Sequence, residues 1–235
     1  MGKRHAEDVS ARCVNIEIVT LRNVLRSAIE DGHLSTLPTV KRLREPKPMR
    51  RMLTPAEIEA VAEAAASAPQ TGQMVADFIR LMAYSGRRWG ETLRLRWQDV
   101  DFDRQQIHFG ADGKSKNGES RAVDFNPKLA DHLRDMGTRK APDSAFLFPA
   151  RHRNERRDLP SITFNKTIRD ARVKAGVPEF TCHACRHFFA SMCLMSKVDL
   201  QTVASWLGHK DNGVLLAKTY SHLLHEITSE PRLPR

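Results

Sequence analysis

The chain has 235 residues, of which 40% are hydrophobic and 28% charged, and its 38 Lys and Arg against 28 Asp and Glu give a net charge of +10. This length can bury one good core with a smaller appendage. Four clustered cysteines are too few for a disulfide framework, and the sequence has neither a secretory signal nor an apolar run of transmembrane length. We therefore expect a cytoplasmic protein and exclude the secreted disulfide-rich and membrane classes.

The positive charge favours a polyanionic partner, because each phosphate that a Lys or Arg neutralises releases counterions. A ribosomal or merely soluble basic protein would carry the same surplus. Charge alone leaves both interpretations open.

The first 51 residues contain one predicted helix and a basic segment. Residues 14–30 form an amphipathic pattern that ends at Asp31-Gly32, with apolar positions at Ile18, Leu21, Val24, Leu25 and Ile29. A single helix cannot bury its own apolar stripe, so it needs a partner. Residues 40–51 hold six Lys or Arg and two Pro, which predicts an extended basic linker, either a solvated hinge or a strap across a DNA backbone.

Residues 52–235 are predicted to form the main domain, which opens with Thr54 as N-cap, Pro55 and Glu57 in a capping box. The fold class that the pattern predicts is mainly α with a small antiparallel β-sheet (α+β). The turn signals Asp112-Gly113 and Asn117-Gly118 separate its two short β-prone runs. We expect strands within 105–109 and 120–125 and a strand or buried turn at 145–149. One helix is expected to begin around residues 87–91. The other expected helices span residues 72–84, 126–136, 161–174, 184–196, 200–207 and 216–226.

Cys182 and Cys185 are spaced as in some metal and redox sites. A structural zinc site needs a second ligand pair at a matching distance, and none stands out. We therefore predict buried thiols beside a helix, and no metal.

Several polar side chains are suited to breaking a DNA phosphodiester without a metal. Such chemistry needs bidentate cations on the non-bridging oxygens, for which Arg is the best side chain, together with a nucleophile and a proton for the leaving oxygen. The chain lacks competing machinery such as a phosphate-binding glycine loop, H-E-x-x-H or G-x-S-x-G.

Five segments carry a family resemblance in chain order: SGRRWGETLRLRW (85–97), SKNGESRAV (115–123), HACRH (183–187), WLGH (206–209) and TYSH (219–222). Together they resemble the catalytic domain of the tyrosine recombinases, the phage integrase family, over roughly residues 52–225. The resemblance implies the tyrosine recombinase catalytic-domain fold. It also implies that 1–39 is a helical remnant of a core-binding domain, 40–51 a basic linker and 52–235 the catalytic domain with its C-terminal tail.

The resemblance implies a role for each matching residue. Tyr220 would attack the scissile phosphate to form a 3′-phosphotyrosyl link, Arg88 and Arg186 would hold the non-bridging oxygens, and Lys116 would protonate the leaving 5′ oxygen. His183 would handle the tyrosine proton and His209 would donate to a phosphate oxygen, without any cofactor. Lys114 remains an alternative to Lys116 because both lie on the same hairpin. Glu91 would orient its neighbours.

The implied activity is site-specific DNA recombination or integration in a mobile element. The implied partners are double-stranded DNA, further copies of the chain in a homotetramer on synapsed DNA, and accessory DNA-bending or directionality proteins, with no membrane. The protein would be cytoplasmic and associated with the nucleoid when bound to DNA. Two alternatives remain open: a type IB topoisomerase-like relaxase, and a DNA-binding remnant that does not cut.

The chain departs from the family pattern at three places in or near these motifs. HACRH stands where the family most often has a sequence close to HDLRH, and neither change removes a catalytic group. Eleven residues separate His209 from Tyr220, slightly more than is common, which predicts a mobile approach to the tyrosine. Asp124 stands where a proline often follows the lysine hairpin.

Overall fold

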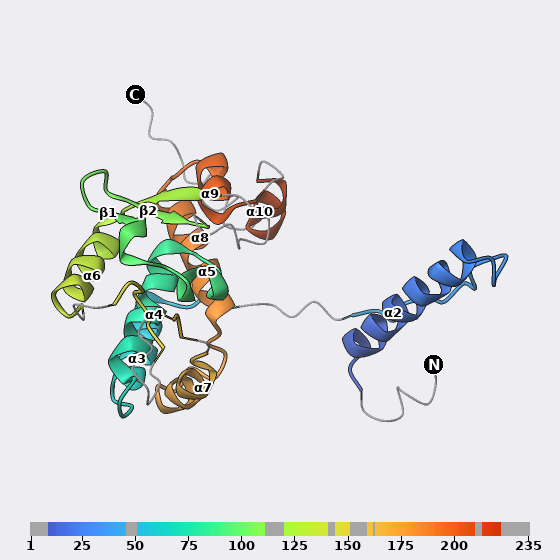
Figure 1. Cartoon of the computed structure of the whole chain (residues 1–235), viewed down its shortest axis with the longest axis horizontal. Helices are drawn as coiled ribbons and strands as arrows, with labels where there is room; N and C mark the ends of the chain where they lie inside the picture. The colour runs from blue at the N-terminus through green and yellow to red at the C-terminus, as the bar shows by residue number, and fades with distance from the viewer. Residues whose placement is uncertain are drawn as a thin grey trace, which may run out of the picture. The chain divides into compact units, whose positions relative to one another are not determined.

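A computed structural model describes residues 9–45, 51–110, 120–140, 144–150, 159–161, 163–209 and 213–221. The chain divides into two compact units, residues 1–51 and 52–235 (Figure 1), and each is described by itself. In the described part of the chain, no helix has both the length and the apolar character that crossing a membrane requires.

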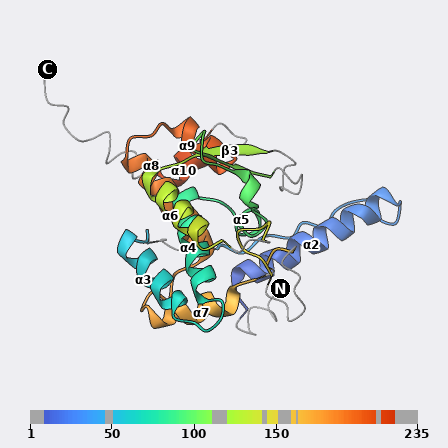
Figure 2. The same cartoon turned by 60° about the vertical axis from the view of Figure 1, so that its left-hand side comes forward.

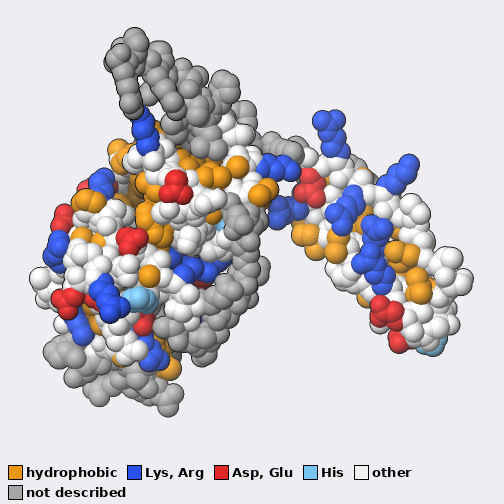
Figure 3. Space-filling model, turned by 90° about the horizontal axis from the view of Figure 1, so that it is seen from above, with side chains coloured by type: hydrophobic (Ala, Val, Ile, Leu, Met, Phe, Trp, Pro, Cys, Tyr) orange, Lys and Arg blue, Asp and Glu red, His pale blue; other side chains and the backbone are white. Residues whose placement is uncertain are grey.

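The smaller unit is built on helix α2, Ala11–Glu30, which starts three residues before the predicted boundary. Ser10 caps it by accepting a hydrogen bond from the Cys13 amide. The helix buries Val14, Asn15 and Ile18, whereas much of its predicted apolar stripe is exposed. Figure 3 shows hydrophobic and basic side chains intermingled on the surface of this unit.

The segment that follows α2 is held against it by one side chain. The Asn15 amide donates to the Leu43 carbonyl at 2.9 Å and to Glu45 at 2.7 Å, and its oxygen accepts from the Leu43 amide at 2.8 Å. Residues 40–45 are in neither helix nor strand, as a linker rich in Arg and Lys predicts.

The larger unit is organised around helix α4, Gly72–Ser85, which contacts α3 (Pro55–Ala66), α5 (Trp89–Leu93), α6 (Pro127–Thr138), α7 (Asn165–Lys174) and α8 (Cys182–Met195). Its central place follows from an apolar sequence that buries Phe78, Leu81 and Met82, all at 1% exposure or less. The predicted capping box of α3 is confirmed: Thr54 and Glu57 each bond the other's backbone amide.

A three-stranded antiparallel sheet follows α5. The 3₁₀ turn η1, Trp97–Asp99, leads into β1, Val100–Asp101, which pairs with β2, Gln106–Phe109, and β2 pairs with β3, Arg121–Asp124. Ile107 opposite Val123 fixes the register, and burial alternates along β2 as a half-buried strand requires. Strands β2 and β3 lie inside the predicted runs, and β1 is additional.

The C-terminal part adds α8, α9 (Leu200–Leu207) and α10 (Val214–Thr219). Figures 1 and 2 both show the sheet with α8, α9 and α10 toward one end of this unit and α3 and α7 toward the other. Two predicted boundaries are wrong. Helix α7 begins at Asn165, because the Ser161 hydroxyl donates to the Pro149 carbonyl instead of capping a helix. Helix α10 ends at Thr219, so Tyr220 is its C-cap residue, and residues 222–226 of the predicted helix lie outside the described residues.

Two hydrophobic clusters hold the unit together. The large one lies between α3, α4, the sheet, α6, α7 and α8, and it includes the buried turn at 145–149, where Leu147 and Phe148 pack. The small one joins α8, α9 and α10: Phe189, Ala190, Leu194, Val203, Ala204, Leu207, Leu216 and Tyr220. The predicted fold class, mainly α with a small antiparallel sheet, is confirmed.

Candidate active site

The turn after α4 places the first arginine. Gly86 ends the helix in the left-handed region, at φ +66°, where a Cβ would lie 2.4 Å from the Phe189 ring. Glycine is the residue that fits both the backbone angle and the close packing. Two residues later Arg88 is the N-cap residue of α5, with a side chain that is 36% exposed. Arg88 can therefore reach a ligand in solvent.

Arg186 connects the turn after α4 with the end of α9. It lies inside α8 with 7% exposure. Its Nη1 donates to the Gly86 carbonyl at 3.1 Å and its Nη2 to the Leu207 carbonyl at 2.6 Å. Burial, followed by the nearby Arg88, lowers the pKa of Arg186 to about 10. This arginine is preorganised by two backbone acceptors.

His209 is held at the C-terminal end of α9. Gly208 takes the left-handed conformation at φ +69°, and the His209 amide donates to the Ala204 carbonyl at 2.9 Å. The His209 ring lies beside Arg186, with Nε2 3.2 Å from Nη2. Since a guanidinium can only donate, His209 Nε2 accepts from Arg186 in this contact, which places the His209 ring directly beside the arginine.

Glu91 is the carboxylate at the centre of an arginine cluster. Its Oε1 accepts from Arg88 at 3.2 Å and from Arg121 at 2.7 Å, and its Oε2 is 3.9 Å from Arg87. Burial by itself would raise the pKa of Glu91, but Arg121, Arg87 and Arg88 outweigh it and the pKa is lowered. Glu91 is therefore ionised when the cluster is intact.

Arg87 is the most unusual member of this cluster because it is fully buried. Its guanidinium lies 4.4 Å from the centre of the Phe109 ring, a cation–π contact. Within the described residues none of its three side-chain nitrogens has a hydrogen-bond partner. Burial, followed by Arg121, lowers the pKa of Arg87. Three guanidinium groups therefore contact the Glu91 carboxylate, and Arg186 interacts electrostatically with both Arg87 and Glu91.

Tyr220 is the C-cap residue of α10. It is 7% exposed, and its hydroxyl oxygen lies 2.6 Å from Nδ1 of His187. The His183 ring meets the His187 ring edge-on, with centroids 4.7 Å apart. His183 and His187 are four residues apart in α8 and so share one helix face.

The chain has one other tyrosine, Tyr84 in α4. Its hydroxyl donates to Glu59, which is also paired with Arg80. Burial, followed by this hydrogen bond, raises the pKa of Tyr84 well above its ordinary value. Tyr84 is therefore a poor nucleophile, and it serves as an internal control for Tyr220.

The cysteines lie on helix faces, Cys182 and Cys185 both in the first turn of α8. Burial raises the pKa of Cys182 to about 12 and raises the pKa of Cys185 well above its ordinary value. Since metals bind the thiolate form, these thiols are poor ligands.

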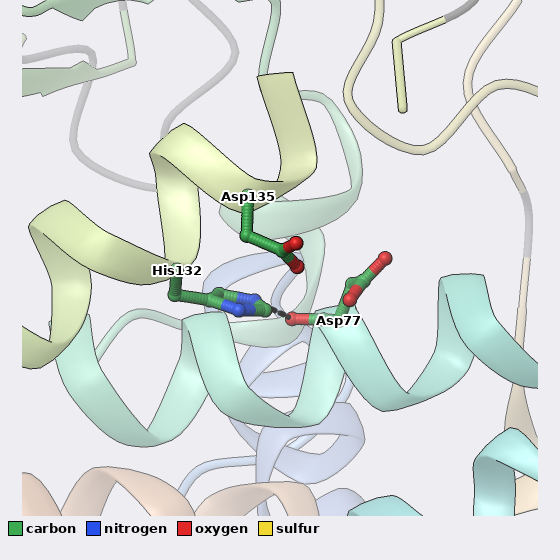
Figure 4. Close-up of side chains that lie close together, drawn as sticks. All are labelled: Asp77, His132 and Asp135. Carbon is green, nitrogen blue, oxygen red and sulfur yellow. Dashed lines mark hydrogen bonds between the residues drawn. The ribbon is translucent and has the colours of Figure 1, made fainter. Parts of the chain in front are cut away.

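A second candidate metal cluster, Asp77, His132 and Asp135 (Figure 4), sits between α4 and α6. Arg139 already binds both carboxylates: Nη1 lies 2.7 Å from Asp77 Oδ2, and Nη2 lies 2.5 Å from Asp135 Oδ2. His132 Nε2 is 3.0 Å from the Asp77 carbonyl. Because a guanidinium occupies the place of a cation, we interpret the cluster as an ion-pair network between two helices.

The structure therefore brings together five of the six predicted residues: Arg88, His183, Arg186, His209 and Tyr220. Lys116 and its alternative Lys114 lie outside the described residues, although the flanking strand β3 reaches the cluster through Arg121.

The sequence analysis did not predict three residues of the site: Arg87 and Arg121 in the arginine cluster, and His187 beside Tyr220. The spacing of four residues from His183 was a signal for His187, since it places both on one face of a helix. No comparable signal pointed to Arg87 or Arg121.

Comparison with known proteins gives the family. Residues 51–226 match the model of the phage integrase family. The chain is 22% identical to the tyrosine recombinase XerA of Pyrococcus furiosus over 209 residues, covering 89% of this chain and 70% of that protein. It is 28% identical to the tyrosine recombinase XerC of Chromobacterium violaceum over 234 residues, covering 95% and 75%.

Solved structures show the same fold. A crystal structure of XerA recombinase matches with a TM-score of 0.59 at 26% identity, covering 79% of this chain and 68% of that one. The Tn1549 transposon integrase, in complex with circular intermediate DNA, matches with a TM-score of 0.73 at 16% identity, covering 97% and 82%. The family match spans most of the chain and includes every motif described above. The chain therefore belongs to the phage integrase family, the tyrosine recombinases, whose members are enzymes that break and rejoin DNA.

Proposed function

We propose that this chain is a site-specific DNA recombinase or integrase that cuts and rejoins DNA through a 3′-phosphotyrosyl intermediate. The arginine cluster carries this proposal, together with Arg186, which interacts electrostatically with both Glu91 and Tyr220. Three guanidinium groups in contact with one carboxylate, with Arg186 interacting electrostatically with it, leave a local surplus of positive charge. A phosphodiester would supply the anion that such a surplus favours.

Arg88 and Arg186 hold the two non-bridging oxygens in this proposal. Arg88 is partly exposed and can close onto the phosphate, whereas Arg186 is fixed by two carbonyls. Donors fixed before the reaction stabilise the developing charge without reorganisation, and one such donor is typically worth about 3–4 kcal/mol. His209, in contact with Arg186, donates to the same oxygens.

Tyr220 attacks the phosphorus, and the 5′ oxygen leaves with a proton from Lys116. The 5′ hydroxyl of a partner strand then reverses the attack, so the phosphotyrosyl bond conserves the energy for rejoining. The arginines supply the charge stabilisation that a metal would otherwise provide, so we expect no cofactor.

Double-stranded DNA is the proposed substrate, which the +10 charge supports. Exchange of two duplexes requires four strand cleavages, so we propose four copies of the chain on synapsed DNA. Accessory DNA-bending or directionality proteins would add to this assembly. The protein would work in the cytoplasm, on the nucleoid.

The test is a covalent adduct. Binding sites are first selected from a random duplex library with wild-type protein, and the selected site is then built as a nicked substrate that traps the cleaved intermediate. We expect a protein–DNA adduct from wild type and from Tyr84→Phe, and none from Tyr220→Phe. An adduct that survives Tyr220→Phe, or none from wild type, contradicts the proposal.

Two further experiments test the metal-free mechanism and distinguish the recombinase from the alternative functions. EDTA should leave the rate of adduct formation unchanged, and loss of cleavage with the chelator would contradict the metal-free mechanism. Relaxation of a supercoiled plasmid without recombinant products would favour a topoisomerase-like activity, and binding without any adduct would favour a DNA-binding remnant.

A further inference from the structure

The hydroxyl of Tyr220 is in contact with a histidine to which the family resemblance assigns no role. His187 Nδ1 lies 2.6 Å from the Tyr220 oxygen, within the range in which a proton can be transferred. The Tyr220 hydroxyl also lies 3.5 Å from the His187 backbone carbonyl. A carbonyl accepts a hydrogen bond but does not take up a proton at neutral pH.

Attack by a tyrosine requires that its proton goes to another group, because a phenol with an ordinary pKa of about 10 is protonated at neutral pH. The arginines near Tyr220 are cationic donors and cannot serve. An imidazole whose Nδ1 is unprotonated can. Among the described residues that contact the oxygen, His187 meets this requirement in geometry and in chemistry.

The two histidines of α8 differ in exposure, and this difference suits them to different roles. His183 is exposed and His187 is half-buried beneath it, on the side toward Tyr220. An exposed histidine can meet a phosphate that arrives from solvent. A half-buried one next to the nucleophile is shielded from the bulk and keeps a fixed distance to it.

We propose that His187 is the proton acceptor for Tyr220. This role rests on the proposed function. As the bond from the Tyr220 oxygen to phosphorus forms, the phenolic proton moves to His187 Nδ1. The bond from phosphorus to the 5′ oxygen breaks, and that oxygen takes a proton from Lys116. In rejoining, each proton returns, so His187 protonates the departing Tyr220. His183 donates to the phosphate.

The tautomer of His187 tests the contact in the free protein. Nitrogen NMR of ¹⁵N-histidine-labelled protein at neutral pH should show His187 with the hydrogen on Nε2 and a bare, hydrogen-bonded Nδ1. The Nδ1 signal should move in Tyr220→Phe and stay in Tyr84→Phe. A hydrogen on Nδ1 would mean that His187 donates to the tyrosine, which overturns the proposal.

The rate of adduct formation tests the step itself. His187→Ala should slow it by roughly 10²–10⁴-fold and leave DNA affinity unchanged, and added imidazole should restore part of the rate. His187→Asn can hold the hydrogen bond but cannot take a proton, so it should be as slow as His187→Ala. His33→Ala, an exposed histidine of the smaller unit, should match wild type.

A substrate with sulfur in place of the 5′ oxygen separates the two proton transfers, because a thiolate leaves without a proton. This substrate should rescue Lys116→Ala and not His187→Ala. Rescue of His187→Ala by the sulfur substrate, or near wild-type rates in His187→Asn, would overturn the role of His187 while leaving the proposed function intact. An absent adduct from wild type would overturn both.

Discussion

Arg121 in β3 and Glu91 in α5 form an ion pair at 2.7 Å, although thirty residues separate them in the sequence. The same carboxylate oxygen holds Arg88. The Arg121 guanidinium also lies against Gly208, because a Cβ on that glycine would be 2.2 Å from the Arg121 Cζ. One side chain therefore joins the strand after the lysine hairpin to the arginine at α5 and to the turn before His209.

The first prediction concerns Arg121→Met. Its removal leaves a buried carboxylate with fewer donors, so the free energy of unfolding should fall by about 1–3 kcal/mol. Adduct formation should slow as well, because Arg88 and the Gly208 turn both lose a contact. Urea unfolding and the trapped-adduct assay measure the two effects.

The control for Arg121 is Arg104→Met in the turn between β1 and β2. Arg104 has a 78% exposed side chain and only a 3.9 Å ion pair with Asp101, and exposed pairs contribute little. We expect no change in either assay. Equal effects of the two substitutions would show that Arg121 has no special position.

The second prediction separates backbone strain from crowding at Gly208. Gly208 and Gly176 both have φ +69°, but a Cβ at Gly176 meets nothing within 4 Å. Gly176→Ala should lower the free energy of unfolding by about 1–2 kcal/mol, because alanine must then adopt the left-handed conformation. Gly208→Ala should cost more in the free energy of unfolding, and it should slow cleavage because Arg121 must move. Gly208→Ala with the stability and activity of Gly176→Ala would contradict this account.

The third prediction concerns the network between α4 and α6. Arg139→Met leaves the buried Asp77 carboxylate without its bidentate partner, so we expect a loss of about 1–3 kcal/mol in the free energy of unfolding. Arg134→Met is the control on the same helix, since the Arg134–Asp131 pair is exposed. EDTA or added Zn²⁺ should leave the Tm of wild type unchanged. A Tm that rises with Zn²⁺ would identify a metal site instead.

Local signals in the sequence predict local structure well here. The Thr54 capping box and the Asn126 cap both act through neighbours within three residues, so their outcome depends little on the rest of the chain. Ser161 has the same chemistry at an N-cap position, but its hydroxyl goes to the Pro149 carbonyl, twelve residues away. A tertiary acceptor overrides the local preference there.

In the candidate site, too, local signals are visible in the sequence and long-range contacts are not. The motif spacing predicts Arg88, Arg186, His209 and Tyr220 as site residues. It does not reveal that Arg87, the neighbour of Arg88, is buried against Phe109, because an arginine is expected at the surface. Contacts across thirty or more residues, such as Arg121–Glu91, depend on how the sheet packs and have no local signature.

Asp124 illustrates how a departure from the family pattern can be structural. It accepts from Gln106 at 2.8 Å and from the Trp206 indole at 3.2 Å. The aspartate therefore ties β3 to β2 and to α9, the helix that carries His209 at its end. A proline at this position could make neither contact.

The last prediction concerns pH. Burial, the largest influence, lowers the pKa of His132 in the folded protein, although its bond to the Asp77 carbonyl opposes this. An unfolded His has a pKa of about 6.5, so below that pH the unfolded chain binds a proton that the folded chain does not. The free energy of unfolding should therefore fall as the pH drops from neutrality through about 6.5 toward the lower pKa of the folded state, by up to about 1.4 kcal/mol per pH unit. Urea unfolding at several pH values should show a shallower slope over this range in His132→Asn than in wild type, whereas His33→Asn should retain the wild-type slope. An unchanged slope in His132→Asn would mean that His132 is not the group responsible.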